Sequence, residues 1–246
     1  MTDCAFIKDT IRKYWDWRSS SFGNDAKKSK DTVEEWKKFL YRSTRDSNGR
    51  SVLDLGTGTG DIALYFAEAG FSVTGIDISS EMIKKAKEHA CRNGHEINFE
   101  CGDAENLRFK DTTFDIITMR NLLWTLPSPQ KAIDEWKRVL KPEGKVIVSD
   151  GYWNNTTIMS LPRLIMKTVR RLPNPSLFIS FRFFFEYIGI YSSLPFYQGI
   201  TGDQARRLFE LSGFRDMELF ENCFDCCPYG KKDKRKPEYF ILTAKL

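Results

Sequence analysis

The chain has 246 residues, a length that fits one domain with additions or two small domains. Its net charge of +5 tolerates an anionic partner but does not require a nucleic acid, and 41% hydrophobic residues is ordinary for a globular protein. No run of roughly eighteen apolar residues occurs that could span a membrane, and the chain opens without the apolar stretch of a secretory signal. The six cysteines are scattered, so we expect reduced thiols and a cytoplasmic protein.

Strand and helix patterns alternate regularly after residue 50. Short apolar runs predict strands at 51–55, 71–76, 97–101, 114–119 and 145–150. Amphipathic or capped segments predict helices at 60–69, about 79–92 and 129–140. Strands separated by helices of this length predict βαβ units and a parallel sheet.

The end of the chain adds a capped helix over "TGDQARRLFELSGF" and two strand-like runs, at 216–224 and 238–246. Their hairpin would place an antiparallel strand near one edge of the sheet. We therefore expect an α/β fold: a Rossmann-like, doubly wound, mostly parallel sheet of seven strands. Four segments are predicted, namely an N-terminal helical cover (1–50), a ligand-binding core (51–152), an inserted helical lid segment (153–200) and a C-terminal helix and hairpin that complete the core (201–246).

A glycine-rich loop follows the first predicted strand, in the stretch "SVLDLGTGTGDIALYF". Gly56, Gly58 and Gly60 lie where the backbone of an open α/β sheet approaches a ligand, at the carboxyl end of a strand. Asp77 ends the second strand, 21 residues after Gly56, where an acid can bind ribose hydroxyls. Together these features favour a nucleoside-containing ligand over a plain turn.

The charges beside this loop indicate which nucleoside. The dinucleotide pattern G-x-G-x-x-G is not met, because Asp61 stands at its last position. Asp54 and Asp61 would repel a phosphate at this helix N-terminus. S-adenosylmethionine has no phosphate and carries an ammonium and a sulfonium, so the flanking carboxylates suit it better than they suit NAD.

Five motifs in order, "LDLGTGTGD", "GIDIS", "GDAENLRF", "FDIITMRNLLWTL" and "WKRVLKPEGKVIVSD", resemble those of class I S-adenosylmethionine-dependent methyltransferases. They are most similar to the small-molecule branch that includes the quinone-biosynthesis C-methyltransferases. The resemblance covers roughly residues 51 to 150, and the tail from Thr201 also fits. It implies S-adenosylmethionine as cofactor, S-adenosylhomocysteine as product, a small-molecule acceptor and no metal.

The resemblance also implies roles for individual residues. Asp54 and the glycine loop would face the methionyl end of the cofactor, together with Arg120 and Asn121. Asp77 would bind both ribose hydroxyls, Ile78 would pack on the adenine, and Asp103 would accept a hydrogen bond from its exocyclic amine. In the N-terminal "YWDWRSSSFG", Tyr14 and Arg18 would reach the cofactor, Arg18 by pairing with its carboxylate. The full implied set is Tyr14, Arg18, Asp54, Gly56, Thr57, Gly58, Gly60, Asp77, Ile78, Gly102, Asp103, Ala104, Arg120 and Asn121.

Methyl transfer from a sulfonium is an in-line displacement, so alignment and exclusion of water matter most. A general base is needed only if the acceptor must lose a proton in the transition state. Asp150, which ends the fifth strand, is the weak candidate for that base, and a structural cap on the next loop is its alternative. His89 and His95 fall on the second helix and its exit, where we expect surface residues.

The acceptor wall is expected at Trp124, Tyr152 and Trp153, although Trp124 also fits a plain core position. In the lid segment, Phe178, Phe181, Phe184 and Phe185 recur at helical spacing. This phenylalanine face fits packing of the lid onto the core, an acceptor pocket, or a membrane-surface contact aided by nearby basic residues, namely Lys167, Arg170 and Arg171.

Several functions remain in competition. The first hypothesis is methyl transfer to a small molecule, and the second is a quinone- or lipid-like acceptor at the membrane surface. RNA or protein methylation comes third; nucleic acid is not expected, because the basic run at 231–236 is not interleaved with aromatic residues. A binding protein without turnover and a dehydrogenase complete the set.

Cys223, Cys226 and Cys227 are close in sequence, but without a fourth ligand they do not predict a metal site. The oligomeric state and the acceptor atom are left open.

Overall fold

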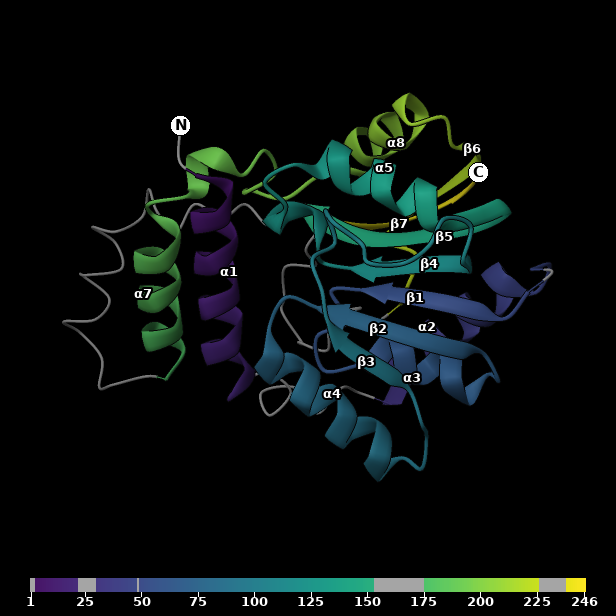
Figure 1. The fold of residues 1–246 in the computed structure, drawn as a ribbon, viewed down its shortest axis with the longest axis horizontal. Coiled ribbons are helices and arrows are strands. Elements are labelled where there is room, and N and C mark those ends of the chain that lie inside the picture. Colours follow the sequence, from purple (N-terminus) through teal and green to yellow (C-terminus); the bar gives the residue numbers. More distant parts are fainter. Residues whose placement is uncertain (1–2, 22–29, 48, 153–174, 226–237) are drawn as a thin grey trace.

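The computed structural model describes residues 3–21, 30–47, 49–152, 175–225 and 238–246. A seven-stranded sheet forms the centre, in the order β3-β2-β1-β4-β5-β7-β6 (Figure 1). The strands are β1 (Ser51–Leu55), β2 (Ser72–Asp77), β3 (Asn98–Cys101), β4 (Phe114–Arg120), β5 (Leu140–Tyr152), β6 (Arg215–Glu221) and β7 (Glu238–Lys245). β1 to β5 pair in parallel, and β7 runs antiparallel between β5 and β6. The predicted doubly wound, mostly parallel sheet with an antiparallel strand near its edge is confirmed.

The helices also begin and end close to where their sequence signals lie. Those of the core are α3 (Asp61–Glu68), α4 (Ser80–Arg92), α5 (Pro129–Val139) and α8 (Gly202–Leu211). Ser79 caps α4, because its hydroxyl accepts from the Met82 amide at 3.1 Å. Thr201 and Gln204 form a capping box at the start of α8.

The fifth strand is longer than predicted. The apolar run at 145–150 extends to Leu140 at one end and to Tyr152 at the other. The extension at the carboxyl end follows from long-range pairing, since Tyr152 lies opposite Glu238 of β7. The local pattern of apolar residues cannot predict this pairing, because the partner strand lies far along the chain.

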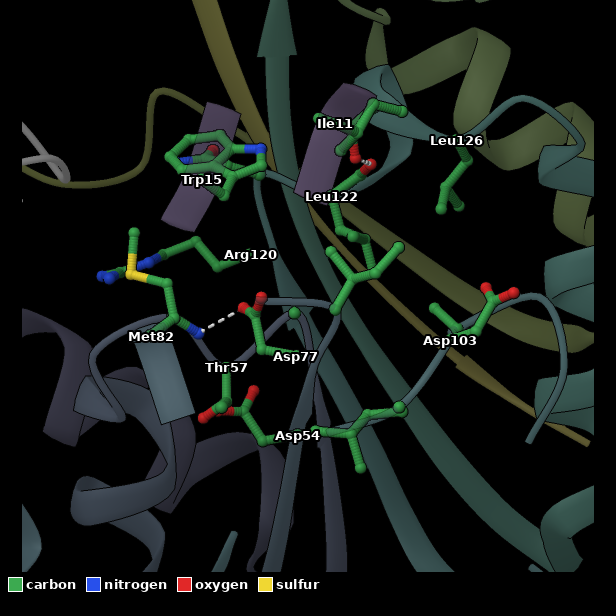
Figure 2. Close-up of a pocket in the computed structure, with 18 of the residues that line it drawn as sticks. Ile11, Trp15, Asp54, Thr57, Asp77, Met82, Asp103, Arg120, Leu122 and Leu126 are labelled. Atoms are coloured by element: carbon green, nitrogen blue, oxygen red, sulfur yellow. Dashed lines mark hydrogen bonds between the residues drawn. The ribbon is translucent and has the colours of Figure 1, made fainter. Parts of the chain in front are cut away.

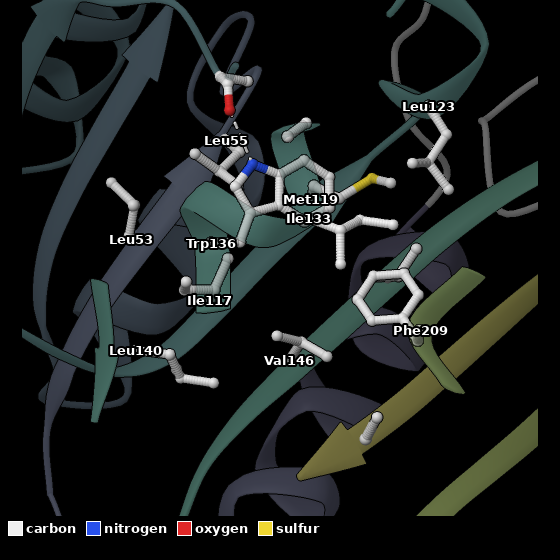
Figure 3. Packing of buried hydrophobic residues seen from close by; sticks show 14 of the residues in the cluster. Leu53, Leu55, Ile117, Met119, Leu123, Ile133, Trp136, Leu140, Val146 and Phe209 are labelled. Atoms are coloured by element: carbon white, nitrogen blue, oxygen red, sulfur yellow. Dashed lines mark hydrogen bonds between the residues drawn. The ribbon is translucent and has the colours of Figure 1, made fainter. Parts of the chain in front are cut away.

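Alternating side chains of the strands build two apolar layers, one on each face of the sheet. Leu53 and Leu55 of β1 point into the layer covered by α5 and α8, whereas Val52 points to the other face. Trp136 of α5 lies within the first layer, close to Met119 and Ile133 (Figure 3). The second layer is covered by α3, α4 and α2 (Lys30–Thr44), so the second half of the N-terminal segment packs on the sheet face.

The first N-terminal helix, α1 (Cys4–Ser19), lies elsewhere, beyond the carboxyl ends of the parallel strands (Figure 1). Beside it stands α7 (Pro175–Tyr187), which belongs to the lid segment. A third apolar cluster joins these helices to the core, with Tyr14, Trp124, Tyr187 and Tyr197 among its buried members. Among the described helices, none is long and apolar enough to cross a membrane.

Candidate cofactor and acceptor site

A cavity of about 510 Å³ lies at the carboxyl ends of the parallel strands, beneath α1 (Figure 2). It sits where the strand order reverses between β1 and β4, which is the usual ligand crevice of open α/β sheets. Residues from the ends of β1, β2, β3 and β4 line its floor, and residues of α1 and α7 line its roof. Of the cofactor residues implied by the sequence, this cavity brings together Tyr14, Asp54, Gly56, Thr57, Gly58, Asp77, Ile78, Gly102, Asp103, Ala104, Arg120 and Asn121.

The glycine loop takes a conformation that side chains disfavour. Gly56 has φ +60°, and a Cβ placed there would come within 3.0 Å of Leu122 Cδ1. Gly60, with φ +79°, is not in the cavity lining; it allows close packing of the loop on Phe99 and Ala86. The Thr57 hydroxyl donates to Asp54 Oδ2 at 2.6 Å, which fixes the loop to the end of β1.

Asp77 is fixed in the cavity by the same loop. Its Oδ2 accepts from the Gly58 amide and its Oδ1 from the Ser79 amide, both at 2.9 Å. Burial raises the pKa of Asp77 from 3.8 to about 6, and burial raises that of Asp54 to about 7. The Arg120 guanidinium and the Thr57 hydroxyl only partly offset the burial of Asp54, and backbone amides only partly offset that of Asp77.

Two lining residues at the end of β4 each have a buried polar atom without a hydrogen-bond partner in the described part of the chain. Arg120 Nη2 donates to Asp61 Oδ2 at 3.2 Å, while Arg120 Nη1 is buried without a hydrogen-bond partner in the described part of the chain. Asn121 Oδ1 is also buried and accepts no hydrogen bond within the described part of the chain. Both residues line the cavity, so a donor and an acceptor without partners in the described part of the chain belong to its lining residues.

Comparison with known proteins identifies the same region. Residues 53–148 match a family model described as a methyltransferase domain. The chain is 36% identical over 119 residues to a ubiquinone biosynthesis O-methyltransferase of Haemophilus ducreyi, covering 46% of this chain and 50% of that protein. It is 30% identical over 165 residues to a ubiquinone/menaquinone biosynthesis C-methyltransferase of Geotalea daltonii, covering 64% and 63%.

The family match and these relatives support a class I S-adenosylmethionine-dependent methyltransferase. A solved S-adenosylmethionine-dependent methyltransferase of Aquifex aeolicus shares the fold, with a TM-score of 0.60 and 20% identity, over 92% of this chain and 97% of that one. The chain spans only half to about two thirds of the length of the two curated relatives.

The cavity suits the cofactor that the family name implies. Three carboxylates line it, those of Asp54, Asp61 and Asp77, and so does Arg120. Asp54 and Asp61 are the two acids that the sequence analysis expected to oppose a phosphate at this loop. In the described parts of the chain, no cluster of His, Cys, Asp and Glu that could hold a metal ion is found.

Of the two N-terminal residues predicted to contact the cofactor, Tyr14 lines the cavity and Arg18 does not. Tyr14 lines the cavity, burial raises its pKa to about 12, and the Arg18 side chain is hydrogen-bonded to it. Arg18 does not line the cavity, and its guanidinium donates to the Ser21 hydroxyl. Arg120, which the sequence analysis assigned to the methionyl end of the cofactor, does line the cavity.

Asp150 does not line the cavity either. It is completely buried, and its carboxylate accepts from the Leu123 amide at 3.0 Å and from the Gly151 amide at 2.9 Å. These bonds hold the short 3-10 helix η1 (Leu123–Thr125) against β5, which supports the structural alternative for this residue.

His89 is half-buried rather than at the surface, because its Nδ1 contacts the Thr59 carbonyl at 3.0 Å behind the loop.

The predicted acceptor wall is only partly assembled. Trp124 lines the cavity, whereas Tyr152 is exposed and its hydroxyl donates to Gln198 at 3.3 Å. Trp153, Cys226 and Cys227 lie outside the described residues, as does the basic run at 231–236. The side chain of Phe178 is likewise not described.

Sequence reasoning missed several residues of the cavity. Phe183 reaches it from α7, one position away from the predicted phenylalanine face, while Phe184 is buried and Phe185 is 68% exposed. The other missed lining residues are Lys8, Ile11, Trp15, Thr59, Ile62, Ile76, Met82, Glu105, Leu122, Thr125, Leu126 and Pro127. The spacing of Ile7, Ile11 and Tyr14 on one face of α1 was the available signal for the roof.

We expect the affinity for S-adenosylhomocysteine to rise roughly tenfold between about pH 5 and pH 8. The ammonium of the ligand favours carboxylates, and the raised pKa values of Asp54 and Asp77 place their ionisation in this range. Calorimetric titration at several pH values measures the effect, and Asp54→Asn should flatten the rise above pH 6. A wild-type affinity that does not change with pH would contradict the assignment.

The same pKa values set the sign of the effect on stability. Both carboxyl groups bind protons more tightly in the folded protein than in the unfolded chain, whose pKa is 3.8. The free energy of unfolding of the ligand-free protein should therefore fall as pH rises through the range from 3.8 to about 7. Bound ligand should offset that loss.

Proposed function

We propose that this protein transfers the methyl group of S-adenosylmethionine to a small, largely apolar acceptor. One observation carries the proposal: a single cavity joins the glycine loop, Asp77 and Asp103 to the unsatisfied atoms of Arg120 and Asn121. Bound S-adenosylmethionine supplies a methyl group on a sulfonium, which leaves by in-line displacement. The residues of the chain then have to hold the cofactor, orient the acceptor and exclude water.

The part of the cavity that the cofactor roles do not use is apolar and aromatic. Its lining includes Ile11, Trp15, Trp124, Leu126 and Phe183. Trp124 lies 6.5 Å from Trp15 and 6.2 Å from Phe183 between ring centroids, so the three rings form a continuous wall. Such a wall favours an acceptor with an apolar or aromatic body over a highly polar one.

A membrane-surface acceptor is the second candidate, because one observation favours it. Phe185, Ile188 and Tyr191 are large apolar side chains at the end of α7 and just after it, and all three are exposed. They lie on the same segment as Phe183, which lines the cavity. An acceptor drawn from a lipid surface would meet this segment first.

The decisive experiment follows methyl-labelled S-adenosylmethionine incubated with the protein and an extract of the source cells. Label in an organic phase would identify a quinone- or lipid-like acceptor, and label in aqueous metabolites would identify a polar one. Binding of S-adenosylhomocysteine without any transfer would instead support a binding protein that lacks turnover. Failure to bind either form of the cofactor would overturn the proposal.

Phe183→Ala tests the acceptor wall. We expect kcat/KM for the acceptor to fall about tenfold, the loss that follows from removing a large apolar contact. The affinity for S-adenosylhomocysteine should change much less. Phe185→Ala is the matched control, because it removes the same side chain from an exposed position on the same helix. Equal losses in the two variants would show that the wall has no specific role.

A further inference from the structure

Lys8, near the start of α1, connects the roof of the cavity to the loop after β3. Its Nζ lies 2.7 Å from Asp103 Oδ2 and 2.7 Å from Glu105 Oε2. The Lys8 side chain is 19% exposed and lines the cavity beside both acids. Lys8 and Asp103 are 95 positions apart in the sequence, so this contact is a product of the fold.

The two acids are held in place by the loop itself. Glu105 is 1% exposed, and its Oε1 accepts from the Ser128 amide at 2.6 Å. Asp103 Oδ1 accepts from the Glu105 amide at 2.9 Å. A carboxylate buried in this way requires a cation, and Lys8 supplies it.

This arrangement leaves part of the Lys8 ammonium available to a ligand. An ammonium has three N–H donors; one donates to Asp103 Oδ2, and Glu105 Oε2 lies close enough to pair with a second. Hydrogen bonds to the two acids raise the pKa of Lys8 against the opposing effect of its burial, so the group stays charged. Because Lys8 lines the cavity, its third donor is available to a bound ligand.

We propose that Lys8 is a cofactor-binding residue: it donates to a ring nitrogen of the adenine while Asp103 accepts from the exocyclic amine. This inference rests on the proposed function, which places the adenine at Asp103. The edge of adenine presents an amine donor next to a ring acceptor, and an adjacent carboxylate and ammonium match that order. Hypoxanthine presents the opposite order, an oxygen acceptor next to an N–H donor, so the pair selects adenine.

The pairing also makes α1 part of the cofactor site. A second contact holds the other half of the helix, since Asp16 Oδ1 accepts from the Ser79 hydroxyl at 2.7 Å at the start of α4. Cofactor bound to Lys8 adds a further connection between α1 and the core. We therefore expect S-adenosylhomocysteine to slow the hydrogen exchange of the α1 amides.

The test compares Lys8→Met with Lys13→Met, which changes an exposed lysine of the same helix that pairs with Asp9. Lys8→Met should weaken S-adenosylhomocysteine about tenfold in calorimetry, as expected for a lost charge-assisted hydrogen bond, and Lys13→Met should leave it unchanged. Protection of the α1 amides on binding should also be lost only in Lys8→Met. Unchanged affinity in Lys8→Met would overturn the inference while wild-type binding keeps the proposed function intact.

A ligand series separates direct contact from a merely structural ion pair. The 1-deaza analogue of S-adenosylhomocysteine lacks the ring nitrogen beside the amine, and it should bind wild type more weakly but bind Lys8→Met as the parent ligand does. An equal penalty for the analogue in both proteins would assign the ring contact to another group and overturn the inference. If Lys8→Met does not fold, Lys8→Gln replaces it; its uncharged and shorter side chain is a weaker donor, so the penalty for the analogue should be smaller than in wild type, and an equal penalty would overturn the inference.

Discussion

Trp136→Ala is expected to lower the free energy of unfolding by about 3–5 kcal/mol, the range for removing a large aromatic side chain from a core. Trp136 is 0% exposed and packs within the layer between the sheet and α5 (Figure 3). Its Nε1 also donates to the Ala104 carbonyl at 2.9 Å. Urea denaturation measures the loss, and Leu211→Ala, at an exposed site on α8, should change the unfolding free energy by less than about 0.5 kcal/mol.

Trp136→Phe separates packing from the hydrogen bond. It retains a phenyl ring in the core but removes the N–H together with part of the indole, so we expect a loss of about 1–3 kcal/mol from the unpartnered carbonyl and a further loss from the smaller ring. Ala104 lies next to Asp103 in the loop that is proposed to receive the adenine. The affinity for S-adenosylhomocysteine should therefore fall in Trp136→Phe as well. If stability falls in Trp136→Phe while affinity stays at the wild-type value, the loop does not depend on this bond.

The elements and the floor of the cavity were predictable because their signals are local. The apolar run of β1, the cap at Ser79 and the capping box at Thr201 each depend on residues that are neighbours in the sequence. Gly56 and Asp77 follow two strands that pair with each other, so a parallel sheet necessarily brings them to one edge. Placing them in one cavity required only the correct order of strands.

The roof of the cavity was not predictable in the same way. Lys8 on α1 meets Asp103, and Arg120 meets Asp61, across long stretches of sequence. No period or spacing encodes such contacts, because they depend on how a helix docks on a finished core. For the same reason the sequence favoured Arg18, which follows an aromatic cluster, over Arg120 as the partner of the cofactor carboxylate.

Asp150 shows how position alone can mislead. The carboxyl end of a strand is where catalytic groups of α/β proteins often lie, and this made Asp150 the weak candidate for a base. The structure shows two backbone amides already bound to its carboxylate, which keeps it turned into the protein. A buried carboxylate with its acceptors occupied stabilises a loop and does not reach an acceptor in the cavity.

Asp77→Ala is expected to weaken the binding of S-adenosylhomocysteine by about 1–3 kcal/mol, the scale for leaving hydrogen-bond donors of the ribose unpaired. The Gly58 and Ser79 amides, which now donate to Asp77, would also lose their acceptor. The affinity should therefore fall by direct loss and by loosening of the glycine loop. Calorimetry measures the change, and Asp46→Ala at an exposed position is the control.

Asp77→Asn distinguishes these two contributions. The amide keeps one oxygen acceptor for a loop N–H, so the loop should stay closer to its wild-type conformation, whereas the charge is lost. If Asp77→Asn loses most of the affinity, the carboxylate acts directly on the ligand, and the pH dependence of binding below about pH 7 should weaken with it. If Asp77→Asn binds as wild type and only Asp77→Ala fails, Asp77 supports the loop and the ribose site has been misplaced. Thermal unfolding of both variants without ligand completes the test, because a purely structural role would lower their stability in proportion to their loss of affinity.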